Sequence, residues 1–111
     1  MKVADVEKFR HTLAHTLKDA FGHRCNITEC EKTTYNDSYL QTRGLTTLYD
    51  TIEILTDDIE LHLEIFDEAV WIFQDNPKEK RFDYKADLPF NSCSSKNAYM
   101  MRLGALIERY I

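Results

Sequence analysis

Apolar and polar residues alternate through the segment 59–74, IELHLEIFDEAVWIFQ, with a break at 67–68. Alternation with a period of two predicts β-strands with one buried face, here over 59–66 and 69–74. Residues 45–55 show a third strand pattern, which is followed by the turn residues Thr-Asp-Asp. Because such short connections permit only hairpins, the three strands are predicted to form an antiparallel meander.

Apolar residues recur at helical spacing near both ends of the chain. From about residue 3 to residue 21 they form one stripe, and Gly22 is a natural stop for this helix. A second stripe predicts a final helix that runs to about Tyr110. One of three serines is expected to cap the start of this final helix: Ser92, Ser94 or Ser95.

The remaining segments carry weaker patterns. Residues 26–35 are predicted to form a strand near a sheet edge, and 39–42 is a candidate for a short return strand. Residues 75–91 read as a long connection, and 81–84 is a candidate for a short extended piece within it. The order α-β-(β)-β-β-β-α predicts one α+β domain over 1–111. It contains an antiparallel sheet of four to five strands, with the N- and C-terminal helices packed on one face.

The hairpin register predicts which side chains share each face of the sheet. Aliphatic residues such as Ile52 and Leu63 pair across the strands and face the helices, and a one-residue slip would reverse the faces. The opposite, outer face then mixes aromatic and acidic side chains around one histidine. These candidate binding residues are Tyr49, Glu53, Glu60, His62, Glu64, Phe66, Trp71 and Phe73.

Three interpretations of this outer face remain open. In the first, the 75–91 segment folds over the face, and Trp71 belongs to a second small core. In the second, the face is exposed and binds a protein partner or a second copy of the chain, since Trp and Tyr are enriched at interfaces. In the third, a small-molecule pocket lies between the sheet and the 75–91 segment.

Composition narrows the classes of function. The chain has 111 residues and a net charge of -5, and this acidic balance disfavours nucleic acid as a partner, because nucleic-acid binding requires a basic face. Three cysteines without dense spacing predict free thiols in a reducing compartment. No segment approaches the ~20 apolar residues of a membrane span. We therefore expect a cytoplasmic protein that does not bind membranes.

The sequence contains no complete catalytic or metal-binding set. His62 with Glu53 and Glu64 is a candidate acid–base group, but no nucleophile or substrate cradle accompanies it. His11 and His15 have a spacing that can hold a metal, although a zinc site needs three or four rigid ligands. Structural thiols are the favoured interpretation of the three cysteines. Neither a metal nor a cofactor is predicted, and an enzyme is the less favoured class. The cysteines are Cys25, Cys30 and Cys93.

The favoured function is that of a small acidic binding protein of adaptor, inhibitor, immunity or chaperone-like kind. Its outer sheet face, with aromatic anchors and an acidic rim, would bind a basic protein partner or form a homodimer, for which the open sheet edge is the other candidate surface. The alternative is a small-molecule-binding or enzymatic cup, with the 75–91 loop as lid and His62 and Glu64 inside.

Overall fold

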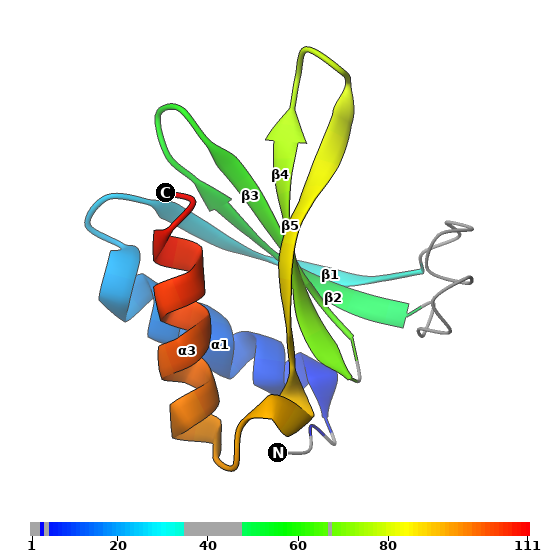
Figure 1. The fold of residues 1–111 in the computed structure, drawn as a ribbon, viewed down its shortest axis with the longest axis vertical. Coiled ribbons are helices and arrows are strands. Elements are labelled where there is room, and N and C mark those ends of the chain that lie inside the picture. Colours follow the sequence, from blue (N-terminus) through cyan, green and yellow to red (C-terminus); the bar gives the residue numbers. More distant parts are fainter. Residues whose placement is uncertain (1–2, 4, 35–47, 67) are drawn as a thin grey trace.

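A five-stranded antiparallel sheet and two helices make up the fold (Figure 1). The computed structural model describes residues 3, 5–34, 48–66 and 68–111, and of residues 31–34, 48 and 49 only the backbone. The strands follow one another in the sheet in chain order, and the predicted α+β class is confirmed. The elements are α1 (Val6–Phe21), β1 (Asn26–Thr34), β2 (Leu48–Leu55), β3 (Glu60–Ile65), β4 (Ala69–Asn76), β5 (Arg81–Pro89), the 3-10 turn η1 (Phe90–Ser92) and α3 (Lys96–Glu108).

The predicted register of the meander is confirmed. Strand β3 pairs with β2 on one side and with β4 on the other, and the aliphatic residues of all three strands meet on one face. This agreement follows from the alternation itself, because any other register would expose the whole aliphatic set. The confirmed pairs include Ile54 with Leu61, Ile52 with Leu63, Leu63 with Ile72 and Ile65 with Val70.

Both helices cover the aliphatic face of the sheet, as Figure 1 shows. The apolar stripe of α1 and that of α3 pack on the sheet residues to form what we call the main core. Tyr99 of α3 lies inside it and donates its hydroxyl hydrogen to the carbonyl of Leu88 on β5, at 2.6 Å. The helical members of the main core are Phe9, Leu13, Ala14, Leu17, Phe21, Tyr99, Leu103 and Ile107.

The prediction of a long connection at 75–91 is wrong, although its candidate extended piece at 81–84 does lie in a strand. Nine of its residues form β5, which pairs with β4 from Asn76 opposite Arg81 to Ala69 opposite Pro89. Strand β5 is therefore the fifth strand of the sheet. The candidate strand at 39–42 lies outside the described residues.

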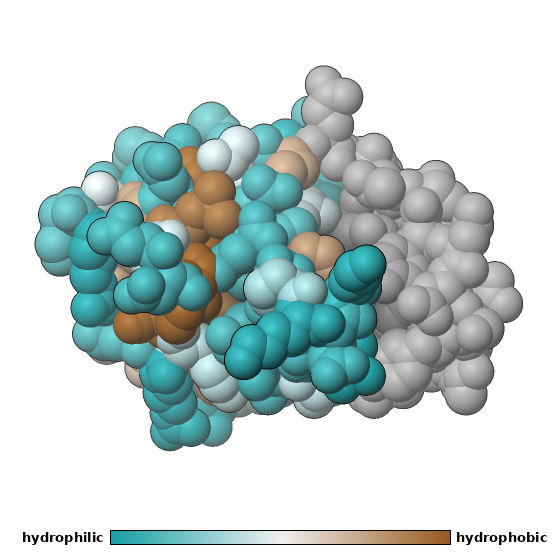
Figure 2. Space-filling model, turned by 90° about the horizontal axis from the view of Figure 1, so that it is seen from above, coloured by the Kyte–Doolittle hydropathy of each residue, from teal (hydrophilic) through white to brown (hydrophobic). Residues whose placement is uncertain are grey.

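Hydrophobic residues reach the surface at one end of the molecule, the end toward which the β2–β3 and β4–β5 hairpins point. Figure 2 views this end from above and shows a hydrophobic patch bordered by hydrophilic residues. The partly buried hydrophobic residues packed against the main core include Ile27, Ile59 and Ile111. In the described part of the chain, no helix combines the length and the apolar character needed to cross a membrane.

The helix ends follow local capping chemistry. Helix α1 begins three residues later than the apolar stripe suggests, because the side chain of Asp5 accepts a hydrogen bond from the backbone N–H of Lys8 at 3.0 Å. Gly22 ends α1 as predicted, and its N–H donates to the carbonyl of Lys18. Of the three candidate serines, Ser95 is the cap of α3.

Replacing Ser95 by alanine is expected to lower the free energy of unfolding by about 1 kcal/mol. The Ser95 Oγ accepts a hydrogen bond from the backbone N–H of Ala98 at 3.1 Å, and alanine leaves that donor without this partner. Urea unfolding followed by circular dichroism measures the loss. The matched control is Ser94→Ala at the adjacent exposed position, and equal losses in the two variants would contradict the assignment of the cap.

Candidate functional site: the outer face of the sheet

A continuous row of side chains crosses the outer face, the side of the sheet opposite the helices. We call it the open row, because its members are exposed or only partly buried. It passes through all five strands at positions that pair directly with one another, and it contains two of the predicted pairings, Glu53 with His62 and His62 with Phe73. Its members are Thr28, Glu53, His62, Phe73 and Tyr84.

A second row runs beside the open row and is much less accessible. Three of its central members, Thr51, Glu64 and Trp71, are 8%, 9% and 1% exposed. The predicted pairings of Glu64 with Thr51 and with Trp71 are confirmed. We call this row the buried row: Cys30, Thr51, Glu64, Trp71 and Asp87.

Trp71 is the centre of a second core. It packs with the fully buried Phe66 and with Ala69, and Phe73 lies against the cluster. The ring centroids of Phe66, Phe73 and Tyr84 lie 5.8, 6.1 and 5.7 Å from that of Trp71. Phe66, Trp71 and Glu64 therefore present almost no surface to a partner, and the interpretation of the entire outer face as exposed is wrong for these residues.

The predicted lid has a different role. Residues 81–89 extend the sheet by one strand instead of folding over it, so no lid made from them encloses His62 and Glu64. Tyr49, another candidate binding residue, pairs through its backbone with Thr33, and its side chain lies outside the described part of the chain.

A bulge in β5 brings two further aromatic residues onto the outer face. Ile72 pairs with Ala86, but the next residue of β4, Phe73, pairs with Tyr84, so that Lys85 has no direct partner on β4. Strict alternation would place Phe82 and Tyr84 on the same face as Ala86. With the extra residue they change to the opposite face, beside Phe73.

These two residues carry the largest exposed aromatic surface of the site. Phe82 is 46% and Tyr84 is 44% exposed, whereas Phe73 is partly buried. The ring of Phe82 lies 4.3 Å from that of His62, centroid to centroid. We define the open patch as the four rings and the three partly buried carboxylates around them: His62, Phe73, Phe82, Tyr84, Glu53, Glu60 and Asp75.

The charges of the open patch are mainly negative. The His62 Nε2 lies 3.7 Å from a carboxylate oxygen of Glu53 and 3.9 Å from one of Glu60, and both glutamates are about one-third exposed, at 33% and 35%. Asp75 pairs with Phe82 across the β4–β5 ladder. The hydroxyl of Tyr84 donates a hydrogen bond to Asp87 at the border of the patch. The patch thus combines ring faces with carboxylates, an arrangement that attracts cations and repels phosphate.

The cysteines do not form a reactive or metal-binding site in the described part of the chain. Cys25 and Cys93 are buried, and none of the three cysteines forms a disulfide among the described residues. Burial raises the pKa of Cys30, and the neighbouring negative charge of Glu53 raises it further, so the thiol stays protonated. Among the described residues, no three His, Cys, Asp or Glu side chains are arranged so that they could hold a metal ion.

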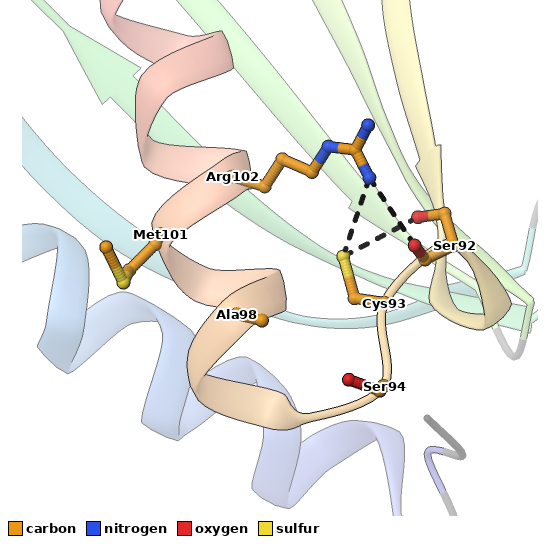
Figure 3. A pocket seen from close by; sticks show the side chains of 6 residues that line it. All are labelled: Ser92, Cys93, Ser94, Ala98, Met101 and Arg102. Atoms are coloured by element: carbon orange, nitrogen blue, oxygen red, sulfur yellow. Dashed lines mark hydrogen bonds between the residues drawn. The ribbon is translucent and has the colours of Figure 1, made fainter.

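The pockets that the structure describes lie away from the outer face. One of about 540 Å³ lies at the start of α3, where Arg102 donates to the carbonyl of Ser92 at 3.4 Å and lies 3.9 Å from the sulfur of Cys93 (Figure 3). Another of about 340 Å³ lies at the start of α1. Neither of these two pockets is lined by His62 or Glu64.

Sequence reasoning found part of this site and missed part of it. Glu53, Glu60, His62 and Phe73 belong to the open patch as predicted candidates, while Phe82 and Tyr84 were not among them. The signal for these two residues was the pair of aromatic positions in 81–84, but their assignment to a face depended on the bulge.

Comparison with known proteins found no matching family model, no matching curated protein and no matching solved structure.

Proposed function

We propose that this protein is a non-enzymatic binding protein that uses the open patch to bind a basic segment of a protein partner. The observation that carries the proposal is the exposure of Phe82 and Tyr84 beside the carboxylates of Glu53 and Glu60. Aromatic residues with a polar rim are typical of the positions that dominate binding energy at interfaces. A net charge of -5 and three cysteines outside disulfides fit a cytoplasmic protein with a basic partner.

Packing beneath the open patch supports this function. Tyr84 and Phe73 pack on Trp71, which is itself nearly inaccessible, so the exposed ring of Tyr84 has a buried ring beneath it. Rings that are already ordered lose little conformational entropy when a partner covers them. The open patch is therefore prepared to bind without rearrangement.

Binding through a face agrees with the form of the sheet edges. Strand β5 carries the bulge at Lys85, and β1 carries an irregularity between Cys30 and Thr33. Bulges in edge strands hinder the addition of another strand. The partner is accordingly proposed to cover the face of the sheet and not to extend it.

Peptide display with the protein as bait tests the proposal. We expect the enriched peptides to carry Arg or Lys, and we expect the double variant Phe82→Ser/Tyr84→Ser to bind them at least about tenfold more weakly, a loss of ~1.4 kcal/mol. Fluorescence anisotropy of labelled peptides measures the affinities. The matched control is Met101→Ser, which removes a large apolar side chain that is 78% exposed on α3, away from the open patch.

Two results would overturn the proposal: enrichment of acidic peptides, or unchanged affinity in the double variant.

A homodimer through the same face is the second candidate, favoured by the exposed aromatic rings. It would bring two acidic rims together, so its association should strengthen when salt screens the repulsion. A basic partner should instead bind more weakly at high salt, and sedimentation at two salt concentrations separates the two cases.

A further inference from the structure

We infer that the carboxylates of Glu53 and Glu60 form the subsite for a cationic side chain of the partner, and that protonated His62 occupies this subsite in its place. The inference rests on the proposed function and deepens it by naming the group that is bound and the condition that releases it. The partner group is a guanidinium or an ammonium. Acidification is the condition that removes it.

The geometry places His62 between the two carboxylates without a close hydrogen bond to either. Its Nε2 is 3.7 Å from Glu53 and 3.9 Å from Glu60, and the imidazole is 19% exposed. A neutral imidazole leaves both negative charges uncompensated by a formal positive charge of its own. A protonated imidazole places a positive charge between them and reduces the attraction for any external cation.

Among the described residues, those that pair directly with His62 across the sheet carry no positive charge. On the outer face, the charged or titratable groups of the neighbouring strands are the thiol of Cys30 on β1, Glu53 on β2, Glu60 and the buried Glu64 on β3, Asp75 on β4, and Tyr84 and Asp87 on β5. The helices contribute nothing here, because they cover the opposite face. Arg81 of β5 is paired with Asp83 at 3.0 Å.

The aromatic rings beside the carboxylates favour guanidinium over ammonium. The rings of Phe82 and His62 are adjacent, and Tyr84 lies in the same part of the outer face. A guanidinium can stack on an aromatic face and donate to two carboxylate oxygens at once, whereas an ammonium acts as a point charge. An arginine of the partner therefore satisfies both the rings and the carboxylates.

Histidine is the side chain that ordinarily changes charge between about pH 5 and 8. We expect an arginine peptide to bind roughly two- to fivefold more weakly at about pH 5.5 than at about pH 7.5, the range that corresponds to one partly exposed ion pair. The probe is an acetylated tetra-arginine peptide amide, with tetra-lysine and tetra-glutamate peptides of the same length beside it. Backbone amide shifts of Glu53 and Phe82 and the emission of Trp71, the single tryptophan, report binding.

The decisive quantity is the ratio of the affinities at the two pH values. In His62→Gln this ratio should fall to about one, whatever the absolute affinity, because glutamine does not acquire a charge. His15→Gln is the matched control. It removes an exposed imidazole that also lies 3.7 Å from a carboxylate, but on α1, and it should keep the ratio of the unmodified protein.

The outcomes separate the inference from the function on which it rests. If neither tetra-arginine nor the display-selected peptides bind at either pH, the proposed function fails and the inference fails with it. If they bind equally well at both pH values, or if His62→Gln keeps the full pH dependence, the inference is overturned while the binding function stands. Stronger binding of tetra-glutamate than of tetra-arginine would overturn both.

Discussion

Replacement of Trp71 by alanine is expected to lower the free energy of unfolding by about 3–5 kcal/mol, the usual cost of deleting a buried aromatic ring. Trp71 is 1% exposed, and its ring contacts those of Phe66, Phe73 and Tyr84. The loss combines the transfer of the indole to water with the cavity that remains below the open patch. Urea denaturation followed by circular dichroism gives the free energy of both proteins.

The matched control is Phe82→Ala, on the same face of the sheet as Trp71 and on the neighbouring strand β5. Because Phe82 is 46% exposed, its removal should cost less than about 1 kcal/mol. The pair of variants separates the second core from the open patch: the first should change stability, the second should change binding. A Trp71→Ala protein as stable as the parent would show that the second core contributes little to folding.

Replacement of Arg10 by methionine is expected to destabilise the protein by about 3–5 kcal/mol, the cost typical of removing one partner from a buried ion pair. The Nη1 of Arg10 lies 3.2 Å from Asp50 and 3.1 Å from the carbonyl oxygen of Cys30, and its Nε lies 3.2 Å from Glu29. The side chain of Asp50 is 1% exposed, so its charge cannot be solvated when the guanidinium is lost. The guanidinium thus joins α1 to β1 and β2.

The acidity of Glu29 reflects the same contact. Burial alone would raise the pKa of Glu29, but the hydrogen bonds from Arg10 and His11 outweigh burial and leave the pKa below its ordinary value. The contribution of a carboxylate with a lowered pKa is present above its ordinary pKa and is lost as the pH falls. The Arg10 contact therefore stabilises the protein at neutral pH.

Two further variants test whether the stability lost in Arg10→Met comes from the buried charge of Asp50. Arg24→Met breaks an ion pair with Glu108 whose side chains are 42% and 64% exposed, and it should cost less than about 1 kcal/mol. The double variant Arg10→Met/Asp50→Asn should recover part of the loss, since it removes the buried charge together with its partner. Equal stability of the Arg10→Met and Arg24→Met proteins would argue against a buried pair.

The confirmed parts of the fold depend on the periodicity of neighbouring residues, and the missed part does not follow a single period. The pairing of Leu63 with Ile52 and Ile72 followed from alternation within short segments, and the stripes of the two helices followed from local spacing. Only residues 81–84 of strand β5 were predicted as extended, because the bulge at Lys85 interrupts the alternation and the polar and apolar positions do not repeat with one period.

The open patch shows the same division. Its members Glu53, His62 and Phe73 were candidates because they belong to strands with clear registers. Phe82 and Tyr84 belong to the open patch only because the bulge places them on the outer face. Trp71, although a predicted candidate, does not belong to it, because its side chain is almost inaccessible to solvent. A period of two assigns a residue to a face of a sheet, but it does not say whether that face is covered.

The sequence by itself determined the class of fold, the register of the meander and the face on which the helices pack, because each depends on the periodicity of neighbouring residues. The tertiary structure decided three other features: the strand at 81–89, the burial of Trp71 and the contact of Arg10 with Asp50. Asp50 lies in the core-facing phase of β2, two residues before Ile52, and Arg10 of α1 supplies a cation to it. Burial and ion pairing depend on residues that are distant in the chain, and the pattern of neighbouring residues does not indicate which distant residues come into contact.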